Sequence, residues 1–367
     1  MSAITIDGDL IHYEKLGRGR PVILIHGWVG SWRYWIPLMQ KLHTSFSVYT
    51  LDLIGFGDSS KNKKKYSVES QVKMLETFLK NMGIPKAAII GHSYGAMVAT
   101  QFTLRNPDKV ARLMLSSMPL YDPGDLDTRI PAGTRQMLTN NDTRHSLAPN
   151  LKDFEQAIPS PTDKTVANTE LYQDPTIASG SKPKTNSGIY TPFHEQPTIQ
   201  RPDTENIDRD ALRRAAAERD RKKNQANPLL NDFRGTTTLN LLEKCYRKSE
   251  PEYEKLKVDV EKADDAVLAK SAEDYEAGNM LDDLRRITAP IVAIHGEDDP
   301  LFNVPKQAIW DYLQLQKKDM FVWLTLPDTR HFPMLEHDAF ASLSTDFLTK
   351  SSITDIEIRE RWRRRSR

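Results

Sequence analysis

The tightest constraint on the fold of this chain is a short turn that joins an apolar segment to a helix-forming one. Residues Ala87–Ile90 are apolar enough for a buried strand, and they enter a Gly-x-Ser-x-Gly turn over residues 91–95. Residues 96–102 follow with a composition that is compatible with a helix. A Cβ at Gly91 or Gly95 would collide with neighbouring backbone in so tight a turn, so both positions require glycine. The pattern predicts a strained strand–turn–helix unit that exposes the hydroxyl of Ser93 at its tip.

The chain also carries the residues that a reactive serine needs. A serine hydroxyl is a weak nucleophile at neutral pH, so it requires a base, and the base requires an orienting acid. His331 lies in a loop after one apolar strand near the C-terminus, and Asp299 lies just after another. Asp298 is the fallback for the acid, and Asp122, after the sixth expected strand, is a less favoured alternative. The chain order is therefore serine, acid, histidine.

Five segments of the chain resemble, in order, motifs of the α/β-hydrolase superfamily. They are Pro21–Trp28 with the oxyanion turn, Leu51–Ser60 with an Asp-x-x-Gly-x-Gly-x-Ser loop, the turn at 91–95, Gly296–Asp299, and His331–Glu336. The resemblance covers roughly residues 1–120 and 286–350, and it covers the middle of the chain poorly. It implies the serine-nucleophile branch with a cap domain. The fold class that follows is α/β, a doubly wound, mostly parallel sheet with an inserted, mostly helical cap.

The resemblance also implies roles for individual residues. It implies a catalytic triad of Ser93, His331 and Asp299, and an oxyanion hole formed by the backbone N–H groups of Trp28 and Tyr94. The candidates for the walls of the substrate pocket are Trp28, Tyr94, Met118, Pro119 and Phe332.

Other polar residues in these motifs are interpreted as structural. His92 precedes the serine, but the geometry of the turn should point its side chain away from the Ser93 hydroxyl. His26 is expected to brace the oxyanion turn, and Asp52 is expected to serve packing and turn formation. The histidines without a motif around them are expected at surface positions: His12, His43, His145, His194 and His337.

Alternating strand and helix patterns define the two ends of the chain as one core, residues 1–119 and 286–350. A hairpin with strands at Ile4–Ile6 and Leu10–Tyr13 is expected around Asp7-Gly8. Further strands are expected near 22–25, 46–51, 110–115, 290–296 and 320–326, and helices near 35–42 and 68–82. Strands that alternate with helices pair in parallel, so the core should be doubly wound.

The regular pattern stops between the two ends, and residues 120–285 are assigned to the cap. Within the cap, about 150–226 is polar and rich in proline, and it is interpreted as a disordered insertion because it has too little apolar surface to offset the entropy of ordering. Helical stretches are expected at 239–247 and 251–278. Residues 351–367 form a basic C-terminal tail.

Composition argues against several classes of function. The chain has 51 Lys and Arg against 50 Asp and Glu, so no nucleic-acid partner is expected. The single cysteine, Cys245, cannot form an intramolecular disulfide or a Cys/His zinc cluster, and no dinucleotide or P-loop motif is present. We therefore expect no metal and no cofactor. The tail could touch an anionic membrane surface weakly, but a solvated helix end is the favoured interpretation.

The N-terminal residues lack a basic region followed by a long apolar run, so neither a secretory signal nor a membrane span is expected. Together with the single cysteine this favours a cytoplasmic location.

The sequence thus predicts a carboxylesterase-like serine hydrolase that forms an acyl-enzyme with a small-molecule ester or related carbonyl substrate. Carbon–carbon bond hydrolysis, amide hydrolysis, acyl transfer and perhydrolysis use the same triad and stay open. A hydrolase-fold ligand receptor without turnover is the most distant alternative. The serine argues against haloalkane dehalogenase and epoxide hydrolase activity, because those relatives have an aspartate at the tip of the turn.

Overall fold

The computed structural model describes residues 2–126 and 227–356, and an eight-stranded sheet lies at its centre. The strand order is β1-β2-β4-β3-β5-β6-β7-β8, and the strands β3 to β8 all pair in parallel. Their bounds are β1 Ser2–Ile6, β2 Asp9–Leu16, β3 Arg20–Ile25, β4 Phe46–Leu51, β5 Ala87–His92, β6 Val110–Ser116, β7 Ile291–Gly296 and β8 Phe321–Leu326. The predicted doubly wound, mostly parallel sheet is confirmed.

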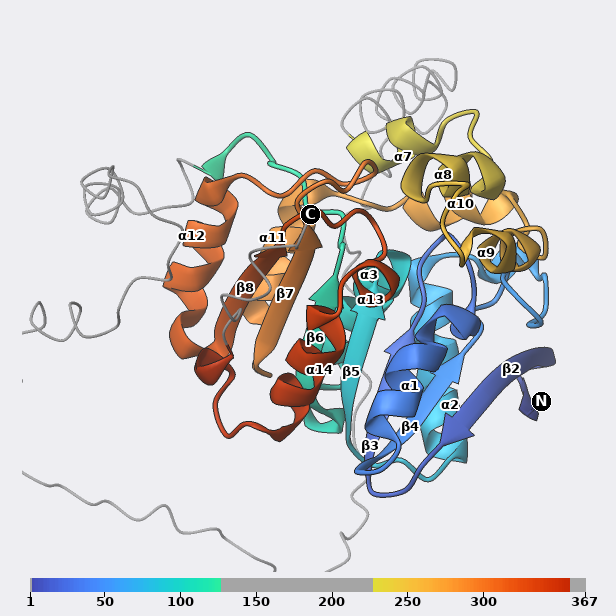
Figure 1. Ribbon diagram of the computed structural model, residues 1–367, viewed down its shortest axis with the longest axis horizontal. Helices are drawn as coiled ribbons and strands as arrows, with labels where there is room; N and C mark the ends of the chain where they lie inside the picture. Colours follow the sequence, from blue (N-terminus) through green and yellow to red (C-terminus); the bar gives the residue numbers. More distant parts are fainter. Residues whose placement is uncertain (1, 127–226, 357–367) are drawn as a thin grey trace, which may run out of the picture. The chain divides into compact units, whose positions relative to one another are not determined.

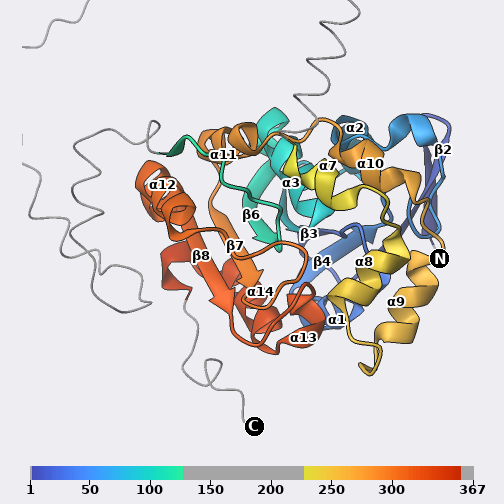
Figure 2. The same ribbon diagram turned by 90° about the horizontal axis from the view of Figure 1, so that it is seen from above.

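Helices cover both faces of the sheet. In Figure 1, α1, α13 and α14 lie in front of the strands, and α2, α3 and α11 lie behind them; Figure 2 shows the same two layers from above. The bounds of these helices and of α12 are α1 Ile36–Leu42, α2 Val68–Asn81, α3 Tyr94–Arg105, α11 Ala277–Arg286, α12 Gln307–Lys317, α13 Pro333–Glu336 and α14 Ala339–Thr349. A parallel sheet covered on both faces explains why its central strands are apolar without alternation.

The N-terminal hairpin adds the antiparallel edge of the sheet. Asp7 and Gly8 form its two-residue loop, and both have positive φ, +48° and +85°. Asp-Gly is the favoured sequence for a tight hairpin turn of this kind. β2 extends to Leu16, three residues beyond the expected end, because Tyr13 to Leu16 pair with Leu51 to Val48 of β4.

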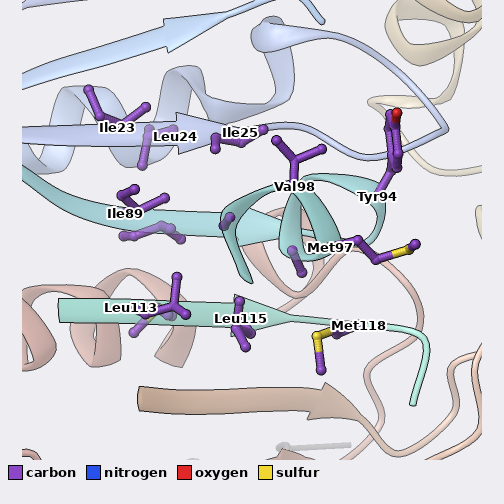
Figure 3. Packing of buried hydrophobic residues seen from close by; sticks show 14 of the residues in the cluster. Ile23, Leu24, Ile25, Ile89, Tyr94, Met97, Val98, Leu113, Leu115 and Met118 are labelled. Carbon is purple, nitrogen blue, oxygen red and sulfur yellow. The ribbon is translucent and has the colours of Figure 1, made fainter. Parts of the chain in front are cut away.

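The core lies between the sheet and its helices. Figure 3 shows Ile23 of β3, Ile89 of β5 and Leu113 of β6 side by side, with Val98 of α3 packed over the strands. All four side chains are buried. Burying a side chain of this size contributes roughly 1.5–3 kcal/mol, so this layer fixes the strands whose carboxyl ends carry the candidate site.

Four short helices lie over the carboxyl ends of the strands in Figure 1. They are α7 Pro228–Phe233, α8 Thr238–Cys245, α9 Tyr253–Val260 and α10 Ala266–Ala272. The continuous helical stretch expected at 251–278 is wrong, because the segment is divided into α9, α10 and the start of α11. Asp264 and Asp265 divide the first two: the carboxylate of Asp264 accepts from Ala266 N, and that of Asp265 accepts from Thr238 N. Such side-chain acceptors compete with the helical hydrogen bonds.

Several expectations lie outside the described residues. These are the insertion at about 150–226, most of the tail at 351–367, and the histidines His145 and His194. Within the described ranges, no helix has the length and apolar character that a membrane crossing requires.

Candidate active site

The turn between β5 and α3 has the predicted strained geometry. Ser93 has φ +54° and ψ −114°, a conformation that side-chain-bearing residues rarely adopt. A Cβ on Gly91 would lie 2.4 Å from the carbonyl oxygen of Gly95, and one on Gly95 would lie 2.3 Å from that of Ile25. Ser93 N donates to the carbonyl of Ser116 on β6 at 2.8 Å. The two glycines and the neighbouring strands therefore hold the serine in this strained position.

The structure brings the three predicted triad residues together. His331 Nε2 lies 3.1 Å from Ser93 Oγ, and His331 Nδ1 lies 2.9 Å and 3.1 Å from the two carboxylate oxygens of Asp299. A carboxylate can only accept, so Nδ1–H donates to Asp299 and Nε2 is free to accept the serine proton. None of the three residues is more than 4% exposed. Three residues distant in the sequence thus form one line of hydrogen bonds.

The carboxylate of Asp299 is held in its charged form. Burial alone would raise its pKa, but the adjacent His331 and the backbone N–H groups of Leu301 and Phe302 hold the pKa of Asp299 below its usual value. Those two N–H groups donate to Asp299 Oδ1 at 2.9 Å and 3.2 Å. A carboxylate fixed in this way can orient the imidazole of His331 and stabilise its protonated form.

The alternative acids lie elsewhere. Asp298 is exposed. Asp122 accepts from Lys306 Nζ at 3.0 Å and from the backbone N–H of Gly124 at 2.8 Å. The geometry therefore favours Asp299 over both.

The turn after β3, for which an oxyanion hole is predicted, lies directly against the serine. A Cβ on Gly27 would lie 2.6 Å from Ser93 Cβ and 3.1 Å from Ser93 Oγ. Trp28 follows Gly27 in the chain. Tyr94 is the first residue of α3, so the N–H of Tyr94 has no acceptor within the helix. His26 braces the turn as expected: its Nδ1 donates to Gly27 O at 2.8 Å, and its Nε2 accepts from Leu53 N at 2.9 Å.

Aromatic side chains surround the triad. Trp28 stacks on Tyr94 with 5.1 Å between ring centroids. The rings of Phe233 of α7 and Trp28 form a T-shaped pair with 4.8 Å between centroids. Phe302 lies 5.6 Å from the ring of His331. Phe332 packs on the ring of His331 at 5.4 Å. Phe233 and Phe302 carry no motif, and the sequence analysis did not identify them.

The other two pocket candidates, Met118 and Pro119, follow β6 and contact α3 and the segment before α11. Met118 is buried and its sulfur lies 3.9 Å from Thr100 Oγ1, whereas the carbonyl of Pro119 accepts from Tyr275 Oη at 3.0 Å. A cavity of about 350 Å³ lies between α2, α3, α10 and α11, but its lining contains no triad residue. This cavity is therefore separate from the candidate site at Ser93.

Two residues without a predicted role contact the loop of His331: Glu336, which is partly buried, and Tyr34, which is buried. Glu336 accepts from the backbone N–H groups on both sides of the histidine, Arg330 at 2.5 Å and Phe332 at 2.9 Å. Tyr34 Oη donates to Nδ1 of His92 at 2.9 Å. Both ring nitrogens of His92 are hydrogen-bonded to groups other than the serine, since its Nε2 donates to the carbonyl of His331 at 2.8 Å. Glu336 is part of a motif that the sequence analysis recognised, but Tyr34 gave no signal.

A second polar cluster lies between β2 and the loop after β4. His12 is only 3% exposed, which contradicts the expected surface position, because its Nδ1 bonds to Asp52 at 3.0 Å. Asp52 also accepts from Trp32 N and Asp58 N, so it serves turn formation as expected. Side-chain atoms of His12, Asp52 and Asp58 that could bind a metal ion lie within 4.8 Å of one another. Asp58, however, already forms an ion pair with Lys262. These contacts join β2, the loop after β4 and the segment after α9.

Comparison with known proteins agrees with this architecture. The model of the alpha/beta hydrolase fold family matches residues 20–338. The chain is 34% identical over 113 residues to a soluble epoxide hydrolase of Corynebacterium sp., which is 31% of this chain and 40% of that protein. It is 35% identical over 99 residues to a (lyso)-N-acylphosphatidylethanolamine lipase of Bos taurus, 26% of this chain and 29% of that protein. The chain thus spans less than half the length of these curated relatives.

Solved structures show the same fold at low identity. An esterase from Thermogutta terrifontis is 16% identical with a TM-score of 0.55, and the match covers 95% of this chain and 99% of the esterase. The enol-lactonase from Burkholderia xenovorans is 15% identical with a TM-score of 0.54, covering 95% of this chain and 100% of the lactonase. The family match extends over most of the sequence, from β3 to the loop that follows α13, so this chain belongs to the alpha/beta hydrolase fold family.

Proposed function

We propose that this protein is a serine hydrolase that cleaves carboxylic esters through an acyl-enzyme. The line of hydrogen bonds from Ser93 through His331 to Asp299 is the observation that carries the proposal. Ser93 Oγ attacks the ester carbonyl carbon while His331 Nε2 takes its proton. The tetrahedral intermediate then collapses, the C–O bond to the alcohol breaks, and His331 returns the proton to the leaving oxygen.

Water completes the reaction. His331 removes a proton from a water molecule, the resulting hydroxide attacks the acyl-enzyme, and the carboxylic acid leaves with Ser93 restored. In both steps negative charge develops on the former carbonyl oxygen, where the N–H groups of Trp28 and Tyr94 would donate to it. Asp299 keeps the imidazole in the required tautomer throughout.

The substrate is proposed to carry an apolar acyl group of small or medium size. The support is a cluster of aromatic rings, in which Tyr94, Phe233 and Phe302 all pack against Trp28 and Phe302 also packs against His331. The names of the two relatives indicate different substrate classes, an epoxide for one and an acyl lipid for the other. The serine at position 93 favours acyl chemistry, because it forms an ester intermediate with a carbonyl substrate.

The domain division is part of the proposal. Residues 1–119 and 286–350 would form the hydrolase core and 120–285 the cap, with the insertion at about 150–226 and the basic tail at 351–367 outside the chemistry. Trp28 supports a cap that contributes to the pocket, since its indole Nε1 donates to Ser271 Oγ of α10 at 2.7 Å.

The first test is turnover of a chromogenic aryl ester, together with labelling by a fluorophosphonate. Ser93→Ala and His331→Ala should each lower kcat on the order of 10⁴-fold or more, and the double variant should lose little beyond either single one. Wild-type protein should be labelled once, and Ser93→Ala should not be labelled. Ser344→Ala is the matched control, because it removes a buried hydroxyl from α14. Ester turnover that survives in Ser93→Ala would overturn the proposed function.

A further inference from the structure

One directed chain of hydrogen bonds connects the oxyanion turn to the loop of His331. Gly27 N–H donates to Tyr34 Oη at 2.6 Å, Tyr34 Oη–H donates to His92 Nδ1 at 2.9 Å, and His92 Nε2–H donates to the carbonyl of His331 at 2.8 Å. Gly27, Tyr34, His92 and His331 are all buried. Water therefore has little access to replace any of these bonds.

The chemistry of its ends fixes the direction of the chain. The carbonyl of His331 can only accept, so His92 Nε2 must donate, and Gly27 N–H can only donate, so Tyr34 Oη must accept it. A neutral His92 then accepts the Tyr34 proton at Nδ1, and every group in the chain is satisfied. A protonated His92 would leave the Tyr34 hydroxyl proton without an acceptor. Burial and the neighbouring His331 lower the pKa of His92 well below its ordinary value, in agreement with the neutral form.

The two ends of the chain adjoin the two groups that must act together on the substrate. Gly27 immediately precedes Trp28, whose N–H is the proposed oxyanion donor, and His331 is the proposed base. Glu336 holds the N–H groups of the residues on both sides of His331, and His92 holds the carbonyl of His331 itself. The ring of His92 lies 4.8 Å from that of His331, and His92 is the residue before Ser93.

We propose that Tyr34 and His92 are positioning residues, which hold the oxyanion turn and the loop of His331 at a fixed separation around Ser93. This inference rests on the proposed function of the site. Neither side chain needs to touch the substrate. Misplacement of catalytic groups by about 1 Å can cost on the order of 100-fold in rate, so a chain that links base and oxyanion hole has a measurable effect.

The test compares Tyr34→Phe with the wild-type protein in aryl-ester turnover and in the rate of fluorophosphonate labelling. Tyr34→Phe removes the acceptor of Gly27 N–H and the donor to His92 while it keeps the ring. We expect kcat to fall by roughly 10- to 100-fold with KM nearly unchanged, and the labelling rate to fall by a similar factor. Tyr66→Phe is the matched control, because it removes another buried tyrosine hydroxyl, which donates to Asp264 in the cap.

A second pair of variants tests the other half of the chain and remains informative if Tyr34→Phe folds poorly. His92→Gln keeps an N–H that can reach the carbonyl of His331, whereas His92→Leu does not. We expect His92→Gln to retain more kcat than His92→Leu, and Tyr34→Phe with His92→Leu to lose no more than His92→Leu alone, because both act on one chain.

Two outcomes separate the inference from the function on which it rests. If Ser93→Ala is inactive and Tyr34→Phe has the kcat and labelling rate of the wild type, the positioning role is wrong and the serine hydrolase stands. Equal losses in His92→Gln and His92→Leu would also overturn the positioning role. If Ser93→Ala is active, the proposed function itself fails.

Discussion

The strained conformation of Ser93 is the residue-scale feature on which the site depends. A backbone held in such a region costs on the order of 1–3 kcal/mol, and the surrounding structure must compensate for it. Here the compensation comes from the close packing of Gly91 and Gly95 and from the hydrogen bond of Ser93 N to β6. The strain points the hydroxyl at His331 and keeps it from capping the helix that begins at the next residue.

The role of Asp299 as the acid of the proposed triad can be tested by replacing one carboxylate oxygen with an amide nitrogen. Asp299→Asn should lower kcat/KM for an aryl ester on the order of 10³- to 10⁴-fold, because an amide nitrogen facing His331 Nδ1–H would favour the wrong tautomer. Asp298→Asn is the matched control, and it should change kcat/KM less than about 3-fold, since its side chain is exposed. Steady-state kinetics at one pH measures both. The reverse order of losses would move the acid by one residue.

The grouping of the three proposed triad residues could be predicted from the sequence because each lies in a local motif after the end of a strand. Ser93, Asp299 and His331 follow β5, β7 and β8, whose carboxyl ends meet at one edge of the sheet. Tyr34 could not be predicted, because its role depends on two partners that only the fold brings to it. The same holds for Phe233 and Phe302, which reach the site from α7 and from the loop after Asp299.

At the scale of elements, hydrophobicity predicted which segments form the central strands, but it did not predict where helices α9 and α10 are divided. Strand β4 has the predicted bounds, since all six of its residues are buried. The division at Asp264 and Asp265 depends on a contact with the core: Asp264 N donates to the carbonyl of Gly55. Helix propensity along 251–278 contains no information about that partner, so tertiary contacts decide where α9 ends and α10 begins.

The turn between β3 and α1 is the element whose position we expect to control the oxyanion hole. Gly27→Ala would bring a methyl group to 2.6 Å from Ser93 Cβ, so the turn must move away from the serine. We expect kcat for an aryl ester to fall 10-fold or more while the protein stays folded. The effect should appear in kcat, since the displaced N–H groups act on charge that develops in the transition state.

The control for that variant is Gly83→Ala. Gly83 has a positive φ, +65°, and a Cβ there meets nothing within 4 Å, so this variant adds backbone strain without a clash near the site. It should cost roughly 1–2 kcal/mol of stability through backbone strain and leave kcat unchanged. Normal kcat in Gly27→Ala, with a stability loss like that of Gly83→Ala, would show that the turn does not form the hole.

For the whole molecule, buried histidines should make folding stability dependent on pH. Burial lowers the pKa of His295 from 6.5 to about 4. Below pH 6.5 the unfolded chain takes up a proton at this residue and the folded protein does not, so the free energy of unfolding should fall as the pH drops from about 6.5 to 4. The slope from one such group is about 1.4 kcal/mol per pH unit.

His295→Gln removes this contribution. Urea titrations between pH 4 and pH 7 should give a shallower dependence of unfolding free energy on pH than in the wild type, whatever the effect of the substitution at pH 7. His43→Gln, at an exposed position on the surface, is the control. An unchanged slope in His295→Gln would mean that this histidine is protonated in the folded protein over the same range.

The one sulfhydryl of the chain offers a way to observe how often the structure around α8, next to the candidate site, opens. Cys245 ends α8, is fully buried, and has a pKa raised well above its ordinary value by burial. The next residue, Tyr246, lies edge-on to Phe332, which follows the proposed base. Because Cys245 is fully buried, an aromatic disulfide reagent can reach its sulfur only when the structure around α8 opens. The rate at which the reagent reacts with Cys245, followed by its change in colour, would therefore report the frequency of these openings without an introduced label.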